Sequence, residues 1–302
     1  MVTSLAEELR AGPVVLDGGL ATELEARGHD LSSALWSARL LVDDPEAIVQ
    51  AHAAFFAAGA RVATTASYQA SLDGFAKAGV DWADGAELIG RSVRLAEQAR
   101  ARADGGPERW IAGSVGPYGA ALADGSEYRG DYGLSVRELR TWHRPRLELL
   151  IEAGVDVLAL ETIPCLAEVE AVLAEIEGTG QPAWLSLTCA GVRTRAGERA
   201  ADGFAMARDV AEIVAVGVNC IDPADAIALV RLAAEVSGKP AVVYPSGGER
   251  WDATTRTWTG IATFTPGDAP TWVASGARLV GGCCRVGPTQ IRAVADAVGA
   301  TG

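Results

Sequence analysis

The stretch LLIEAGVDVLAL (149–160) joins a helical pattern to a strand pattern through one glycine, Gly154. Apolar residues with helical spacing end at the glycine, and the unbroken apolar run VLAL follows. The same order of helix, small residue, glycine and strand recurs in FFAAGARVATT (55–65) and WVASGARLVGG (272–282). Because buried strands that alternate with helices form parallel sheets, the sequence predicts an α/β fold built from repeated βα units.

Eight segments have the composition of strands that are covered on both faces, with apolar residues at consecutive positions. They are VVLDGG (14–19), RVATTASY (61–68), WIAGSVG (110–116), DVLALET (156–162), PAWLSLTC (182–189), AVGVNC (215–220), PAVVYPS (240–246) and RLVGGCC (278–284). Eight βα units in 302 residues favour a (β/α)₈ TIM barrel over an open doubly wound sheet. No linker or low-complexity stretch divides the chain, so we expect a single domain over residues 1–302.

Helix starts and loop lengths support this reading. Asp44-Pro45 and Asp222-Pro223 each place an N-cap residue before a first-turn proline, and Ser135 with Glu138 forms a capping box. The first three strands are widely spaced, so their following loops carry extra residues, including GPYGAALADGSEYRGDYG (116–133). The loops that follow the strands at their carboxyl ends build the active site of a barrel, so we expect the extra residues to be functional.

Composition limits the possible partners and the compartment. The formal net charge is −13, from 39 acidic and 26 basic residues, which argues against binding to nucleic acid or to an anionic membrane. The N-terminal segment has neither a basic region followed by an apolar one nor a stretch of about 18 apolar residues, so we expect a cytoplasmic protein. Five cysteines without framework spacing make structural disulfides unexpected.

Thiols and carboxylates gather at the predicted carboxyl ends of the strands, which converge on one face of a barrel. These residues are Asp17, Thr64, Thr65, Glu161, Cys220, Cys283 and Cys284. Strands six and eight are separated by one strand, about 10 Å of arc, so their cysteines can meet. Three thiolates that leave one coordination position open are typical of a catalytic zinc site. We interpret Cys165 and Cys189 as ordinary buried cysteines.

The adjacent pair Cys283-Cys284 can bind one metal only if the backbone leaves strand geometry, which Gly281-Gly282 permits. Asp17 and Glu161 follow apolar runs, where an unpaired charge is costly, so we expect a cationic partner; the alternatives are a salt bridge to a barrel arginine and a helix N-cap. The amides of Gly18 and Gly19 could hold a ligand carboxylate. Together these groups describe a site for a thiol amino acid.

Seven segments in this order make the sequence resemble the homocysteine S-methyltransferase family, whose members are zinc-dependent barrels. The matching segments are DGGLATELEARG (17–28), TTASYQAS (64–71), GSVGPYGAALADGSEYRGDY (113–132), ETIP (161–164), GVNC (217–220), YPSGGERWD (244–252) and GGCCR (281–285). The resemblance implies one homocysteine-binding barrel domain that methylates L-homocysteine to methionine. It implies that Cys220, Cys283 and Cys284 are the zinc ligands and that Asp17 and Glu161 bind the substrate ammonium.

The long loop resembles the branch of the family that takes the methyl group from a sulfonium, S-methylmethionine or S-adenosylmethionine. We expect no separate protein base, because coordination to the metal deprotonates the thiol. No segment matches the folate or cobalamin modules of methionine synthases. We expect the donor to meet Trp36, Thr64, Ser246, Glu249 and Trp251, with the tryptophans as aromatic walls for a cation or as core packing. The family commonly has Asn-Ser where this chain has Ser246-Gly247, a difference that bears on donor preference.

Three other interpretations compete with this one. The same chemistry could serve another thiol or selenol acceptor, such as selenocysteine. A non-enzymatic barrel could use Cys283-Cys284 as a zinc or thiol sensor, although such a sensor gives no reason for Asp17 and Glu161 to face the thiols. A metal-free aldolase-like barrel would need a lysine at a strand end, and neither Lys77 nor Lys239, the only lysines, lies at one.

Overall fold

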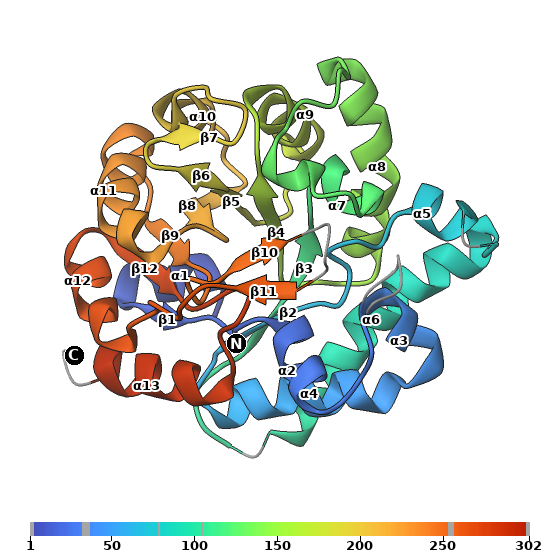
Figure 1. The fold of residues 1–302 in the computed structure, drawn as a ribbon, viewed down its shortest axis with the longest axis horizontal. Coiled ribbons are helices and arrows are strands. Elements are labelled where there is room, and N and C mark those ends of the chain that lie inside the picture. Colours follow the sequence, from blue (N-terminus) through green and yellow to red (C-terminus); the bar gives the residue numbers. More distant parts are fainter. Residues whose placement is uncertain (1–2, 32–36, 78, 104, 253–256, 300–302) are drawn as a thin grey trace.

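Eight parallel strands form a ring at the centre of the molecule, with helices outside it (Figure 1). The structure is a computed structural model of the chain and describes residues 3–31, 37–77, 79–103, 105–252 and 257–299. The ring runs in the order β1 (Val14–Val15), β12 (Ala277–Val280), β9 (Ala241–Tyr244), β8 (Ile213–Asn219), β5 (Ala183–Leu187), β4 (Val157–Ile163), β3 (Trp110–Val115) and β2 (Val62–Thr64). A parallel bridge between Leu16 and Val62 closes it. The predicted TIM-barrel fold and its eight strands are confirmed.

The helices and short elements connect these strands in chain order. They are α1 (Leu5–Ala11), α2 (Leu20–Ala26), α3 (Ser37–Asp43), α4 (Pro45–Ala57), α5 (Leu72–Lys77), α6 (Trp82–Arg102), α7 (Tyr118–Leu122), η1 (Ser126–Tyr128), α8 (Val136–Glu152), α9 (Leu166–Ile176), α10 (Ala200–Met206), η2 (Pro223–Asp225), α11 (Ala226–Ser237), η3 (Pro266–Asp268), α12 (Ala269–Ala274) and α13 (Pro288–Gly299). Two small antiparallel pairs are added, β6 (Cys189–Ala190) with β7 (Arg193–Thr194) and β10 (Arg250–Asp252) with β11 (Thr257–Thr259).

The expected helix starts are largely confirmed. The Asp44 carboxylate accepts from the Ala47 amide at the start of α4, and Ser135 and Glu138 form a capping box on α8. Asp222 begins a 3₁₀ turn, η2, before α11 follows. The residues expected in long early loops form α2, α3, α5, α7 and η1, which lie between the first three barrel strands and their covering helices.

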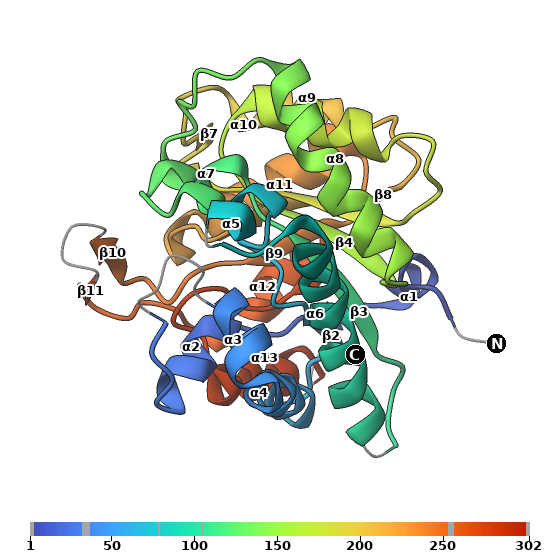
Figure 2. The ribbon, with the colours of Figure 1, turned by 90° about the vertical axis from the view of Figure 1, so that its right-hand side faces the viewer.

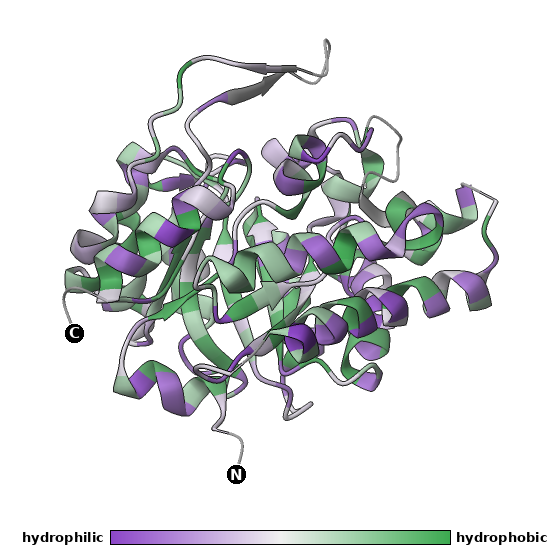
Figure 3. Ribbon diagram, turned by 90° about the horizontal axis from the view of Figure 1, so that it is seen from below, coloured by the Kyte–Doolittle hydropathy of each residue, from purple (hydrophilic) through white to green (hydrophobic). Residues whose placement is uncertain are grey.

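The core has two layers, one inside the ring and one between the ring and the helices. Alternate residues of β4 show the division: Val157 and Ala159 belong to the inner cluster, whereas Leu158 and Leu160 belong to the outer one. Figure 3 shows hydrophobic colour along the central strands and both colours on the helices. Because both faces of the strands are buried, consecutive apolar residues in the sequence predicted them correctly.

The two ends of the barrel are closed differently. Leu5 and Leu9 of α1 pack into the inner cluster, and Figure 2 shows α1 at one end of the molecule and the β10–β11 pair at the other. The end with β10 and β11 is the one where the barrel strands finish, and it carries the loops that follow them. Among the described residues, no helix combines the length and the apolar character needed to cross a membrane.

Candidate active site

The strands end in a polar layer that faces the interior of the barrel. In β4 the inward positions are Val157, Ala159 and then Glu161, because side chains of a strand alternate between its two faces. The equivalent last inward positions of the neighbouring strands are polar as well. They are Ser114 of β3, Ser186 of β5, Asn219 of β8 and Tyr244 of β9, all of them buried. The barrel is therefore apolar for most of its depth and polar where the active site of this fold lies.

The sulfurs of Cys220, Cys283 and Cys284 lie within 4.8 Å of one another at the ends of β8 and β12. The Sγ of Cys284 lies 3.8 Å from that of Cys220 and 4.0 Å from that of Cys283. Tetrahedral ligands at about 2.3 Å from a zinc ion are about 3.8 Å apart, so both distances suit a shared metal. The structure thus brings together the three cysteines that the sequence analysis selected.

Cys220 and Cys283 form a disulfide in the structure, although the sequence predicts none. That expectation was wrong for this pair: side chains that converge on one metal site can also turn toward each other and form a bond, and a separation of 63 residues in sequence does not reveal it. A disulfide sulfur is not a thiolate ligand, so this bond must be reduced before all three sulfurs can bind a metal. Cys165, Cys189 and Cys284 are free thiols.

Burial and, after it, the negative charges of Glu127 and Glu161 raise the pKa of the Cys284 thiol to about 12. At neutral pH this thiol therefore stays protonated unless a positive charge compensates it. A divalent metal ion supplies that compensation and favours sulfur ligands if it is zinc.

The glycines before the cysteine pair act differently from the expectation. The strand does end at Val280, but neither Gly281 nor Gly282 has a positive φ. They are needed for space, since a Cβ on Gly282 would lie 2.2 Å from Cγ1 of Val286 and one on Gly281 would lie 2.7 Å from Cβ of Leu16. The left-handed conformation falls on Cys220 itself, with φ 48°.

The Glu161 carboxylate is held by hydroxyl groups. Its Oε1 accepts a short hydrogen bond from Oγ of Ser114, and its Oε2 accepts one from the hydroxyl of Tyr244 at 3.0 Å. The Tyr244 hydroxyl also meets Oγ of Ser186 at 2.7 Å and accepts from Nε1 of Trp184 at 3.0 Å. Burial raises the pKa of Glu161 to about 6, and the two hydroxyls oppose that shift.

Asp17 lies just after β1 and is 4% exposed. Its carboxylate accepts from the amide of Thr64 at 2.6 Å and from the Thr64 hydroxyl at 2.9 Å. Burial, and more weakly the charge of Glu161, raises its pKa to about 7. No cationic side chain among the described residues contributes to the pKa of Asp17 or of Glu161, so the structural salt bridge considered from sequence is not found there.

The two glycines after Asp17 line the same cavity as Asp17, and the amide of one of them already has a partner. The Gly19 amide donates to the carbonyl of Val286 at 2.9 Å and precedes α2, so it cannot hold a ligand carboxylate as expected. A Cβ on Gly18 would lie 2.3 Å from the carbonyl oxygen of Val286, which explains why that position has no side chain. For the Gly18 amide the role stays a prediction.

A cavity of about 120 Å³, which we call the inner cavity, contains these groups. Its lining includes the three cysteines, both carboxylates and Gly18. Thr64, which we expected at the donor, also lines the inner cavity and is bonded to Asp17. The predicted metal ligands and the predicted ammonium-binding residues thus share one cavity.

A second, more open hollow of about 500 Å³, the outer cavity, borders the same thiols. Tyr128, Cys220 and Cys284 line both cavities. Ser246 and Glu249, expected at the donor, line the outer one. Of the two tryptophans expected with them, Trp36 lies outside the described residues, and only the backbone of Trp251, in β10, is described.

Several cavity residues were not selected from the sequence. They are Ser114, Glu127, Tyr128, Asn219, Tyr244 and Trp258. Ser114, Asn219 and Tyr244 each lie two residues after an inward-facing residue of the same strand. Because side chains of a strand alternate between its two faces, this spacing could have identified them once the strand ends were known. Glu127 and Tyr128 come from η1, inside the long loop expected to be functional, where no periodicity exists to place them.

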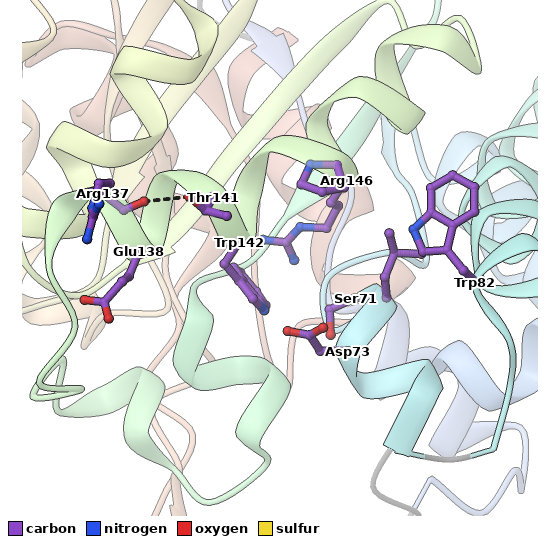
Figure 4. Close-up of a pocket in the computed structure, with 10 residues that line it drawn as sticks. Ser71, Asp73, Trp82, Arg137, Glu138, Thr141, Trp142 and Arg146 are labelled. Atoms are coloured by element: carbon purple, nitrogen blue, oxygen red, sulfur yellow. Dashed lines mark hydrogen bonds between the residues drawn. The ribbon is translucent and has the colours of Figure 1, made fainter.

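Figure 4 shows a third hollow, of about 550 Å³, outside the barrel. It lies between α8 and the α5–α6 corner and is lined by Trp82, Trp142 and Arg146 among others. Arg146 is buried there and donates to the carbonyls of Tyr68 and Gly116. No thiol and neither of the two carboxylates lines this hollow, so it is separate from the site.

The fold and the site define a class: a TIM barrel in which three cysteines fit for one metal face a cavity with two carboxylates, as in metal-dependent enzymes that act on thiols. The family model described as homocysteine S-methyltransferase matches residues 14–298. The chain belongs to this family and is an enzyme of it.

Individual relatives agree. The homocysteine S-methyltransferase of Escherichia coli (strain K12) is 46% identical over 302 residues, covering 93% of this chain and 94% of its own. The homocysteine S-methyltransferase YbgG of Bacillus subtilis (strain 168) is 44% identical over 293 residues, which cover 93% of this chain and 93% of its own. The crystal structure of the homocysteine methyltransferase MmuM from Escherichia coli in its metallated form has a TM-score of 0.84 and 41% identity, covering 94% of this chain and 96% of its own.

Proposed function

We propose that this enzyme transfers a methyl group from a sulfonium donor, S-methylmethionine or S-adenosylmethionine, to the thiol of L-homocysteine, with Zn²⁺ as its cofactor. One observation carries the proposal. Three cysteine sulfurs that suit one metal ion, and two buried carboxylates without a cationic partner among the described residues, line the same small cavity. An amino acid with a thiol and an ammonium matches these groups.

The side chains present fit zinc. Thiolates favour this ion, and three protein ligands leave the fourth position of a tetrahedral site for another group. When bound, zinc would keep its sulfur ligands, including the thiol of the acceptor, deprotonated at neutral pH. We therefore assign Cys220, Cys283 and Cys284 as its ligands and no protein side chain as general base.

The acceptor is oriented by the opposite wall of the inner cavity. We assign Asp17 and Glu161 to its ammonium and the Gly18 amide to its carboxylate. The hydroxyls of Thr64, Ser114 and Tyr244 hold the two carboxylates in place. Because the cavity is small and its carboxylates are almost fully buried, an acceptor that fills it would exclude water from the sulfur.

The methyl group would move between the two cavities. The donor would enter the outer cavity, where Ser246 and Glu249 lie, and present its methyl group across the boundary that Tyr128 and the cysteines form. A lone pair of the acceptor sulfur forms the new bond to the methyl carbon, and the electrons of the broken bond return to the donor sulfur. The products are methionine and a neutral thioether, and the acceptor's thiol proton passes to solvent.

The wider setting follows from the same groups. We propose that residues 1–302 act as one homocysteine-binding barrel domain in the cytoplasm, where reducing conditions keep the cysteines available as thiolates. The acidic surface implied by the net charge of −13 does not suit nucleic acid or an anionic membrane as a partner. The chemistry proposed needs no cobalamin or folate.

The test is a methyl-transfer assay on reduced, zinc-loaded protein, with S-methylmethionine and S-adenosylmethionine as donors and homocysteine and selenocysteine as acceptors. We expect methionine from homocysteine with at least one of the two donors. Faster turnover of selenocysteine at equal concentration would favour the selenol acceptor instead. Zinc binding without turnover of any of these pairs would overturn the proposal and leave the sensor.

A further inference from the structure

Glu127 is a third carboxylate in the inner cavity, and the chemistry above gives it no task. It belongs to η1, in the loop between β3 and α8, and its Oε2 is buried without a hydrogen-bond partner among the described residues. Arg129, two residues later, pairs with Asp131 at 3.3 Å and with Asp124 at 3.9 Å, both different carboxylates. The charge of Arg129 offsets the burial of Glu127 only weakly, so the carboxylate is incompletely compensated and a ligand cation is a natural further partner.

The charges of the reactants indicate which cation this is. Homocysteine brings one ammonium, and Asp17 and Glu161, which influence each other electrostatically, already face it from hydrogen-bonded positions. The methyl donor brings two more positive groups, an ammonium and a sulfonium. Only the sulfonium has to lie beside the acceptor sulfur for the methyl group to transfer, and it loses its charge as the methyl group leaves. The carboxylates of the outer cavity already have partners: Asp222 accepts from the Ala224 amide, Asp225 from the Gly191 amide and Glu249 from Arg285. In the inner cavity, Glu127 is the carboxylate left for the sulfonium.

The position of Glu127 points to the donor side as well. Its neighbour Tyr128 lines both cavities, so this turn of the chain forms part of their boundary. Asp17, by contrast, is held by Thr64 at the end of β2.

Resting on the proposed function, we propose that Glu127 binds the positive charge of the sulfonium donor at the boundary of the two cavities and thereby selects cationic donors. Burial raises the pKa of Glu127 itself to about 7, as expected for a carboxylate whose cation arrives with the substrate. The function of the loop 116–133 would then be to place this carboxylate in the cavity that the cysteines line.

The test compares Glu127→Gln, which keeps the shape and removes the charge, with Glu127→Asp and with Asp131→Asn. Asp131 lies in the same loop, but its side chain is 71% exposed, so its variant controls for changes to the loop. Steady-state kinetics give kcat and KM for the donor and for homocysteine separately. Calorimetry with S-methylmethionine alone measures donor binding without turnover, and zinc content reports folding.

In Glu127→Gln we expect kcat/KM for the donor to fall and the donor Kd to rise about ten- to a hundredfold. A sulfonium has no N–H or O–H to donate, so the loss is one of Coulomb attraction, which is partly offset by desolvation of the charges. The KM for homocysteine and the zinc content should not change, Glu127→Asp should recover part of the loss, and Asp131→Asn should match the wild type. Equal donor constants in Glu127→Gln and wild type, or an equal loss for homocysteine, would overturn the inference alone. If the wild type accepts no methyl group from either sulfonium, the proposed function fails, and this inference with it.

Discussion

Replacing Asp17 by asparagine separates the charge of this residue from its structural contacts. Asp17 accepts from the amide and from the hydroxyl of Thr64. An asparagine can keep both contacts, because its Oδ1 accepts from the amide and its Nδ2 donates to the hydroxyl oxygen. The variant therefore loses the negative charge while the hydrogen-bonded geometry remains, and two opposite effects are expected from that single change.

The first effect is on stability. Burial raises the pKa of Asp17 to about 7 from its ordinary value of 3.8. The folded protein thus holds a proton that the unfolded chain releases, so the free energy of unfolding falls as pH rises from about 4 to about 7. A pKa raised by about three units lowers the free energy of unfolding by up to about 4 kcal/mol at pH values above 7. Asp17→Asn removes this cost and should raise Tm at pH 8, with little change at pH 4.5.

The second effect is on the acceptor. Loss of a charged hydrogen bond to the ammonium should raise the Kd of homocysteine about ten- to 150-fold. The analogue 4-mercaptobutanoate lacks the ammonium, so its Kd should change little in the variant. Calorimetry with both ligands and melting curves at the two pH values provide the data. A lower Tm at pH 8, or equal weakening of both ligands, would refute the reasoning, and Asp131→Asn serves as the exposed control.

Three further substitutions have defined outcomes. Cys284→Ser should lose zinc and at least about a hundredfold in activity. Replacing residues that only hydrogen-bond to metal ligands already costs about 10- to 100-fold in metal affinity or activity, so the loss of a ligand should cost at least as much. Metal analysis showing full zinc, together with an unchanged rate, would contradict this. Gly282→Ala places a Cβ 2.2 Å from Cγ1 of Val286 and should cost about 1–3 kcal/mol of stability and weaken zinc binding, as melting and metal titration would reveal. Tyr244→Phe leaves the buried Trp184 Nε1 without its acceptor, so denaturant unfolding should give a loss of about 1–3 kcal/mol, with a higher KM for homocysteine; wild-type values for both would count against the network.

The fold was predictable because its signals are local and repeated. Consecutive apolar residues, glycines at helix ends such as Gly154 and N-caps such as Asp44 each describe a few neighbouring residues. Eight such units suffice to indicate a closed barrel. Once the strand ends are known, period-two alternation also places Glu161 inward with the cysteines nearby.

The remaining features depend on contacts between distant segments. The Cys220–Cys283 disulfide joins residues that follow two different strands. The Gly19 amide donates to the carbonyl of Val286, which lies near the other end of the chain. The crowding at Gly282 depends on Val286 in the same way, so the sequence suggested backbone freedom where the structure needs space. Glu127 lies in a loop without periodicity, and only its placement in three dimensions brings it to the thiols.

The central claim is that the three cysteines hold a zinc ion whose remaining position is taken by the acceptor thiol. X-ray absorption spectroscopy at the zinc edge of reduced, zinc-loaded protein tests it directly, since sulfur neighbours at about 2.3 Å are distinct from nitrogen and oxygen neighbours at about 2.0–2.2 Å. We predict three sulfur neighbours in the protein alone and four after addition of homocysteine. An unchanged number of sulfur neighbours with saturating homocysteine would contradict the account.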